Sequence, residues 1–272
     1  MPTEPPKVAS ARKRRPANGK RRSKRRIKRG WIPNYHGAWA MIIIPPLVGI
    51  IEGGFRPAHI PLLATWWVGY FFFFAATVWL RSQLKERFRA PVVAYAVASG
   101  VAGLATWWAA PYLWRWVPLF LPLVALAGWA AWKRQDRSLG AGLDTVVAAS
   151  LLLPVSWDVA SGGVAGLAAT PQIWTQTALL FGYFAGTVFY VKTNIRERNS
   201  NGYLVASIVW HALWLVVAVI VSNPWHVAVW VALVARAVAV PLARRRGVGI
   251  SVTAIGVAEV VTSILVTTSL LV

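Results

Sequence analysis

Long apolar runs recur along this chain, and short polar or basic segments separate them. Each run is close to the length of about 20 residues that an α-helix needs to cross a bilayer. The runs therefore predict an all-α, multi-pass transmembrane bundle of nine helices. These helices are expected near residues 37–53, 60–80, 90–110, 112–132, 141–157, 173–191, 203–222, 226–243 and 249–271.

Residues 1–30 differ from the rest because they are rich in Lys, Arg and Pro, with Glu4 as the one acid. Such a segment has almost nothing to bury, so it predicts a disordered basic tail ahead of a helical domain at 31–272. A tail of this charge can bind phosphate groups of lipids or nucleic acids. Because it is tethered at a membrane, anionic lipid is the expected partner and nucleic acid is not expected.

The charge balance indicates which way the bundle crosses the membrane. The chain is 57% hydrophobic and holds 29 Lys and Arg against 8 Asp and Glu. Basic clusters at 81–89, 133–137, 192–198 and 244–246 fall in alternate loops, whereas the other loops hold only Arg56 and Arg115. Cytoplasmic loops carry the excess of Lys and Arg. The pattern predicts a bacterial cell-membrane protein with its N-terminus cytoplasmic and its C-terminus external. Tryptophans at the predicted outer interface, Trp107, Trp108, Trp114 and Trp116, fit an aromatic belt.

Residues 74–87 and 184–198 match in character almost position by position. The match predicts two four-helix repeats, at about 37–132 and 141–243, with an extra helix at 249–271. An even number of helices keeps both copies in the same orientation, as parallel repeats require. The alternative is that two basic helix ends resemble each other by chance.

Ionisable groups are costly inside a bilayer, so they are functional candidates. The six at or within the predicted helices are His36, Asp144, Lys192, His211, Arg236 and Glu259. All six map to the cytoplasmic half, which predicts a polar cavity open to the cytoplasm. In it, His36, Asp144, His211 and Glu259 are the candidate acid–base residues. Glu259 needs a partner, either Arg236 or His211. Two alternatives are that Asp144 offsets a helix dipole from the first turn of its helix, and that His211 is a core histidine.

Two pairs of basic residues are spaced four apart, Arg81 with Lys85 and Lys192 with Arg196. Each pair is expected on one helix face, and together they would form a basic mouth suited to phosphate or carboxylate. The candidate ligand-binding residues are Asn34, Arg81, Lys85, Lys192, Arg196 and Arg236. The alternative is that the basic residues only set the topology and contact lipid phosphates. The absence of cysteine excludes thiolate chemistry and Cys-ligated metals, and no metal or cofactor is expected.

Residues 31–41, 186–198, 210–212 and 256–259 resemble the YwiC-like family of bacterial membrane proteins, which is functionally uncharacterised. The helix count and the repeats also resemble the architecture of the UbiA prenyltransferase superfamily. That resemblance implies two Asp-rich motifs that hold magnesium and an isoprenoid diphosphate. Here Arg81 to Lys85 and Lys192 to Arg196 stand in their place, so ordinary magnesium–diphosphate binding is not expected.

Three functions are compatible with the sequence. The first is an intramembrane enzyme or binding protein for an anionic, lipid-like ligand, such as an isoprenoid or phosphorylated lipid. The second is a transporter of a small organic anion, although the outer half is expected to lack ionisable residues and hence a polar path. The third is a structural or regulatory protein whose tail recruits a partner. The sequence leaves open whether the chain is an enzyme, which ligand it binds and its oligomeric state.

Overall fold

A computed structural model describes residues 30–33 and 38–272 of the chain. Within these residues the chain is helical and contains no strand. The basic tail, Asn34 and His36 lie outside the described residues. The α-helices are α2 (Ala38–Gly53), α3 (His59–Arg81), α4 (Arg89–Ala109), α5 (Val117–Trp132), α6 (Leu139–Ser150), α7 (Leu152–Ala160), α8 (Pro171–Ile195), α9 (Asn201–Val221), α10 (Pro224–Arg245) and α11 (Val252–Leu270). Three short 3₁₀ helices, η1 (Glu86–Phe88), η2 (Pro111–Trp116) and η3 (Gly166–Ala168), lie in the connections.

The predicted all-α bundle is confirmed. Helices α6 and α7 are separated only by Leu151 and together correspond to one predicted segment, so the described residues form nine helical segments. Seven of these segments are long and apolar enough to cross a membrane. Helix α2 is shorter, and α8 is not among the seven although it has 25 residues, because polar residues interrupt it. The chain is therefore a multi-pass membrane protein.

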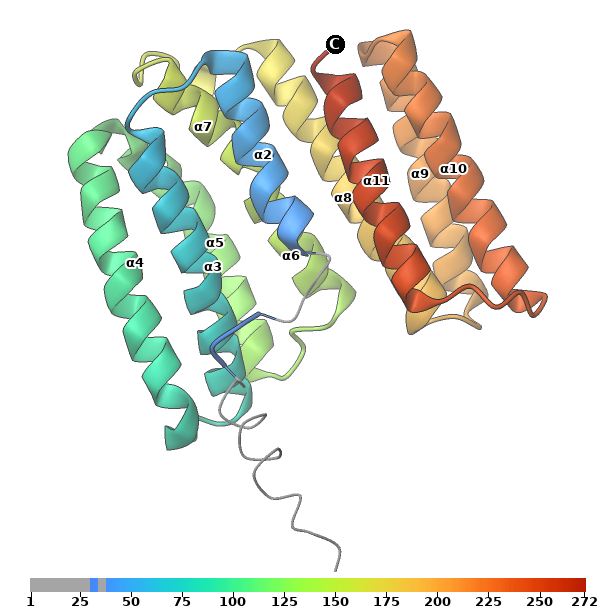
Figure 1. The fold of residues 1–272 in the computed structure, drawn as a ribbon, viewed down its shortest axis with the longest axis horizontal. Coiled ribbons are helices and arrows are strands. Elements are labelled where there is room, and N and C mark those ends of the chain that lie inside the picture. The colour runs from blue at the N-terminus through green and yellow to red at the C-terminus, as the bar shows by residue number, and fades with distance from the viewer. Residues whose placement is uncertain (1–29, 34–37) are drawn as a thin grey trace, which may run out of the picture.

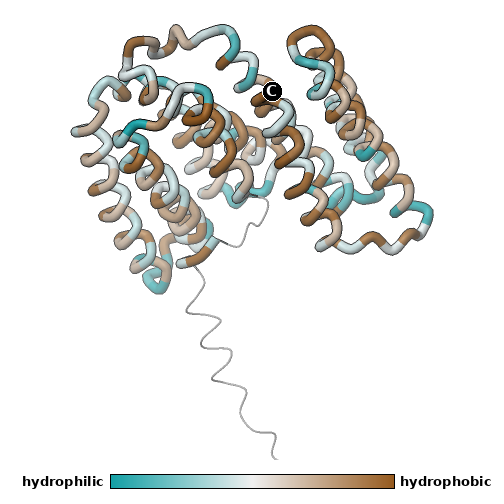
Figure 2. Tube along the Cα trace, turned by 45° about the horizontal axis from the view of Figure 1, so that its top comes forward, coloured by the Kyte–Doolittle hydropathy of each residue, from teal (hydrophilic) through white to brown (hydrophobic). Residues whose placement is uncertain are grey.

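The helices run side by side, and successive helices point in opposite directions (Figure 1). The connections α3–α4, α5–α6, α8–α9 and α10–α11 lie together at one end, here called the basic end because they carry the basic clusters. The C-terminus lies at the other end, here called the opposite end. Hydrophilic residues gather at the turns and apolar residues along the helices (Figure 2), as expected for a bundle surrounded by lipid.

Helices α3 to α5 lie on one side of the molecule and α8 to α11 on the other, with α2, α6 and α7 between them (Figure 1). Helix α2 packs closely on α7: a Cβ added at Gly49 would lie 2.3 Å from the carbonyl oxygen of Leu153. The main apolar core surrounds α8, where Tyr183, Phe184 and Leu180 are buried. The duplication of a four-helix unit stays a prediction.

The tryptophans at the opposite end divide into two groups. Trp107, Trp108 and Trp114 are exposed, as an aromatic belt requires. The prediction for Trp116 is wrong, because its side chain is only 2% exposed and its indole nitrogen donates to Asp158 over 2.8 Å. Its position in η2 turns it into the bundle instead of towards the membrane interface.

Candidate functional site

Three consecutive residues of α8 face three different helices. Gly186 packs against α9, where an added Cβ would lie 3.0 Å from Nε2 of His211. Thr187 donates a hydrogen bond to Glu259 of α11 over 3.0 Å, and Val188 packs against α6. Successive residues of an α-helix point about 100° apart. Gly186, Thr187 and Val188 therefore contact α9, α11 and α6 in turn.

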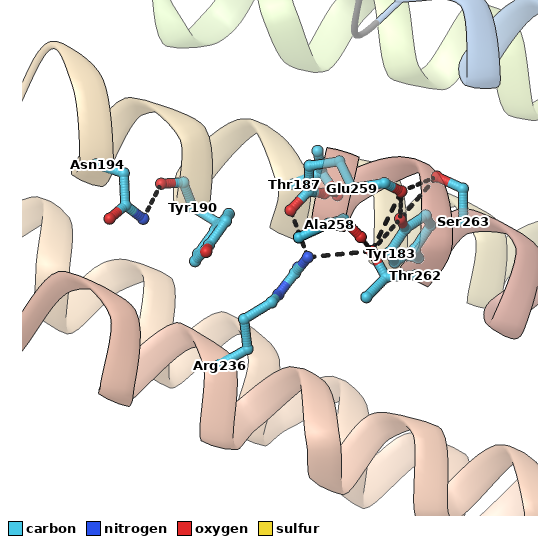
Figure 3. A network of polar contacts seen from close by, with 9 residues as sticks. All are labelled: Tyr183, Thr187, Tyr190, Asn194, Arg236, Ala258, Glu259, Thr262 and Ser263. Atoms are coloured by element: carbon cyan, nitrogen blue, oxygen red, sulfur yellow. Dashed lines mark hydrogen bonds and ion pairs between the residues drawn. The ribbon is translucent and has the colours of Figure 1, made fainter. Parts of the chain in front are cut away.

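Arg236 of α10 and Glu259 of α11 form a buried ion pair at the centre of a polar network (Figure 3). Their side chains are 11% and 12% exposed. The Nη1 atom of Arg236 donates to Glu259 Oε1 and, over 3.1 Å, to Thr262 Oγ1. The second carboxylate oxygen of Glu259 accepts the bond from Thr187. The prediction that Arg236 is a partner of Glu259 is confirmed.

Two tyrosines of α8 complete this network (Figure 3). The guanidinium carbon of Arg236 lies 4.2 Å from the ring centroid of Tyr190, which is a cation–π contact. The hydroxyl of Tyr183 lies 2.8 Å from Ser263 Oγ and 3.3 Å from the carbonyl oxygen of Glu259. The tyrosines therefore hold the guanidinium and the turn of α11 that carries Glu259.

Charge is balanced in this network, but hydrogen-bond donors are in excess. Both carboxylate oxygens of Glu259 have partners, whereas Nε and Nη2 of Arg236 are buried without a partner among the described residues. These two nitrogens lie on one edge of the planar guanidinium. Their N–H bonds match the two oxygens of a carboxylate or phosphate. Because buried donors are rarely left unpaired, this edge is the feature of the site that calls for a ligand or water.

Among the described residues, His211 forms no hydrogen bond with the ion pair. Its side chain is 1% exposed, and Nδ1 lies 2.7 Å from the carbonyl oxygen of Ser207, which can only accept. The proton is therefore on Nδ1, and Nε2 faces Gly186 without a hydrogen-bond partner among the described residues. The alternative interpretation of His211 as a core histidine fits this environment. The prediction that it shares a polar cavity with Glu259 stays a prediction.

The first basic pair does not share a helix face. Helix α3 ends at Arg81, and Gln83 and Leu84 adopt positive φ angles of 59° and 60° that turn the chain away. Arg81 forms an ion pair with Asp136 over 2.9 Å, whereas Lys85 is exposed. The prediction that Arg81 and Lys85 act together is wrong because the helix ends too early.

The second basic pair, Lys192 and Arg196, does contact one common acceptor, but this acceptor is a backbone carbonyl oxygen of the protein itself. Nζ of Lys192 donates to the carbonyl oxygen of Arg137 over 2.9 Å, and Nη1 of Arg196 reaches the same oxygen at 3.5 Å. Together with Arg81 and Asp136, these contacts hold the α5–α6 connection from both sides. The predicted basic mouth is therefore filled by the chain's own acceptors.

Asp144 belongs to α6, whose Gly142 packs against Val188 of α8. Because Ser138 caps the helix and α6 begins at Leu139, Asp144 is beyond the first turn, and the predicted first-turn position is wrong. Its Oδ1 is buried without a partner among the described residues. A cavity of about 180 Å³, lined by largely apolar residues such as Phe73 and Val188, lies between α2, α3, α5, α6 and α8. This cavity is separated from the Arg236–Glu259 pair by α8.

Sequence reasoning missed a buried acid at the opposite end. Asp158 in α7 is 0% exposed and accepts hydrogen bonds from Arg115 at 2.7 Å, Trp116 at 2.8 Å and the backbone nitrogen of Gly166 at 2.8 Å. The expectation that the outer half lacks ionisable residues is therefore wrong. Since both oxygens of Asp158 have partners, this network joins η2 and η3 to α7 and has a structural role.

Comparisons with known proteins agree with the fold. A family model described as "YwiC-like protein" matches residues 32–157, which end within α7. An uncharacterized protein YwiC of Bacillus subtilis is 30% identical over 200 residues, which cover 71% of this chain and 79% of that protein. An uncharacterized protein of Haemophilus influenzae is 24% identical over 199 residues, covering 70% and 77%. No solved structure matches, so the UbiA-like architecture stays a prediction. The chain belongs to the YwiC-like family of bacterial membrane proteins.

Proposed function

We propose that this protein binds the anionic group of a ligand, a carboxylate or a phosphate, at Arg236 within the membrane. The observation that carries the proposal is the unpaired Nε–Nη2 edge of a guanidinium whose charge Glu259 already balances. An unpaired buried donor costs about 1–3 kcal/mol. An anion that accepts from both nitrogens removes that cost and adds charge-assisted hydrogen bonds.

The basic end is the natural entrance to this site. Tyr190 and Asn194 continue the polar face of α8 from the ion pair towards that end, where Arg244 donates to the carbonyl oxygen of Asn194. A rim of positive charge raises the local concentration of anions. Small anions and the head groups of anionic lipids share this chemistry, so both are candidate ligands.

The proposal is binding and not catalysis, because no hydrogen bond joins Glu259 to His211 or Asp144, the other candidate acid–base residues that the structure describes. Glu259 is at the site, His211 lies against Gly186, Asp144 belongs to α6, and His36 is outside the described residues. Transport of a small organic anion is the alternative. It is favoured by Gln176 and Tyr183, which extend the polar face of α8 towards the opposite end.

We also propose that the basic end faces the cytoplasm, because basic loops are retained there. Ser138, at the basic end, and Val164, at the opposite end, are exposed positions in a chain without native cysteine. A cysteine at Ser138 is expected to react with a membrane-impermeant maleimide only after the cytoplasmic side is opened, and one at Val164 in intact cells. Labelling of the Ser138 cysteine in intact cells would contradict this orientation.

Binding at Arg236 can be measured with the purified protein and defined anions. Native mass spectrometry would compare dioleoyl phosphatidic acid and oleate with dioleoyl phosphatidylcholine, and calorimetry would use inorganic phosphate and acetate. Arg236→Gln is expected to weaken binding of the active anion about tenfold to a hundredfold, since it removes a charged bidentate donor. Binding of the lipids but not of the free ions would identify a lipid head group as the ligand. Binding of the free ions but not of the lipids would identify a small anion.

Two further variants separate binding from stability. Arg236→Gln combined with Glu259→Gln removes both charges and is expected to fold without binding the anion. Arg245→Gln is the matched control, because Arg245 is also an α10 arginine but donates to the carbonyl oxygen of Ser200 over 2.8 Å and to Asn201, at the start of α9, over 2.7 Å. Equal anion binding by the wild type and the double variant would rule out this site.

A further inference from the structure

A second cavity, which has a polar lining, lies at the opposite end of the bundle. It is bounded by α8, the α9–α10 connection and the end of α11. Its volume is about 310 Å³. That is the lower end of the range of about 300–1,000 Å³ for small-molecule sites. The polar residues that line it are Gln172, Thr175, Gln176, Ser222, Asn223, His226 and Ser269. No Lys or Arg is among the lining residues.

The amide nitrogens of Gln176 and Asn223 donate to acceptors of the protein itself. Nε2 of Gln176 donates to Glu52 over 2.7 Å and to the carbonyl oxygen of Leu270 over 3.2 Å. Nδ2 of Asn223 donates to the carbonyl oxygen of Ser269 over 3.0 Å. Gln176 therefore offers its oxygen to anything that enters, whereas Asn223 Oδ1 already accepts the backbone N–H of His226 over 2.8 Å.

His226 adds no positive charge. The indole Nε1 of Trp230 can only donate, and it lies 2.9 Å from Nε2 of His226, so Nε2 is the acceptor. The imidazole proton is then on Nδ1 and is donated to Ser269 Oγ over 2.7 Å. That hydroxyl donates in turn to the carbonyl oxygen of Val266 over 2.9 Å. This chain of bonds holds His226 in its neutral form.

Acceptors remain in excess. Gln176 is 4% exposed, and its Oε1 is buried without a partner among the described residues. Glu52, at the end of α2, is bonded by the amides of Gln172 and Gln176 and has no cation within ion-pair distance in the described part of the chain. Glu52 does not itself line the cavity, but its partners Gln172 and Gln176 do. A carboxylate that lacks a counterion therefore lies next to the cavity's unpaired amide oxygen, which is the reverse of the donor excess at Arg236.

We propose that this cavity binds a primary ammonium group. Its N–H bonds would pair with Gln176 Oε1, and its charge would balance Glu52. An ammonium group supplies three donors and no acceptor, so it can pair with the buried Gln176 Oε1, which has no partner among the described residues. Both a free amine and the head group of phosphatidylethanolamine carry this group. The site is independent of Arg236, because its residues lie at the opposite end of α8.

The test compares primary with quaternary ammonium compounds on the full-length protein. Ethanolamine and dioleoyl phosphatidylethanolamine are expected to bind at least about tenfold more tightly than choline and dioleoyl phosphatidylcholine, because N-methylation keeps the charge and removes the donors. Binding of the lipid alone identifies a head-group site, and binding of ethanolamine alone a site for a free amine. Equal binding of primary and quaternary compounds, or no binding of either, would overturn the proposal.

Variants locate the binding to this cavity. Glu52→Gln is expected to weaken ethanolamine or phosphatidylethanolamine binding about tenfold, because the ammonium loses its counterion. Glu197→Gln, an acid in the connection at the basic end, is the matched control and should bind as the wild type does. Arg236→Gln should also leave ammonium binding unchanged, so failure of this proposal is distinguishable from failure of the anion site. Unchanged ammonium binding by Glu52→Gln would contradict the assignment.

Discussion

Asp158→Asn is expected to destabilise the folded protein by about 3–5 kcal/mol, the usual cost of removing one partner from a buried ion pair. The carboxylate is 0% exposed and accepts from Arg115, Trp116 and Gly166, and the asparagine would leave the guanidinium without a counterion. For a protein of this size, such a loss lowers the melting temperature by about 10 °C. Thermal unfolding in detergent or nanodiscs measures it.

Asp136→Asn is the matched control for this prediction. Asp136 also pairs with an arginine, but the Arg81 side chain is 33% exposed and water can solvate it when the pair is lost. The expected change is therefore within about 1 kcal/mol, as for other surface ion pairs. If both substitutions shift the melting temperature equally and by little, the Asp158 network does not hold the opposite end together.

The membrane segments could be predicted from the sequence because their length and apolar character follow directly from the thickness of a bilayer. The partner of Glu259 could be predicted for a similar reason. A charge in the middle of a membrane helix requires a counter-charge, and Arg236 was one of very few groups able to supply it. Both predictions rest on the free-energy cost of placing polar or charged groups in lipid. That cost is so large that the predictions do not depend on the details of packing.

Predictions about shared sites failed where they depended on angles and helix ends. Lys192 and Arg196 have helical spacing and contact the same atom, but that atom is the carbonyl oxygen of Arg137 and not an open anion site. Arg81 and Lys85 have helical spacing, yet α3 ends at Arg81 without a glycine to mark the turn. Such features depend on which helices pack together, and the spacing of residues alone does not determine that.

Asp158 was missed for a related reason. The apolar pattern places the end of the helix near residue 157, whereas α7 continues to Ala160 and η2 and η3 fold over its last turn. An acid that appears to lie in a loop is thereby completely buried. Its partner Arg115 is visible in the sequence as one of only two basic residues in the predicted outer loops, and that rarity is the signal that could have indicated the pair.

Glu259→Gln is expected to lower the melting temperature more than Arg236→Gln does, and the double variant should recover part of the loss. Removing Glu259 leaves a guanidinium that cannot lose its charge. Removing Arg236 leaves a carboxylate that can take up a proton and still accept from Thr187. Removing both leaves no charge to bury, so the double variant should be more stable than the sum of the two single losses predicts. This difference, the coupling energy between Arg236 and Glu259, should be about 1–3 kcal/mol.

The control for this coupling replaces a different acid. Glu52 accepts hydrogen bonds from Gln172 and Gln176 and lies near the other end of α8, so it shares no partner with Arg236. Glu52→Gln and Arg236→Gln should therefore have additive effects, within about 0.5 kcal/mol. Each pair of single variants and its double variant form a double-mutant cycle. If the Arg236–Glu259 cycle shows coupling and the Arg236–Glu52 cycle is additive, the interaction belongs to the ion pair. Strictly additive losses in both cycles would mean that Arg236 and Glu259 are separate packing elements, and the unpaired guanidinium edge would then no longer point to an anion.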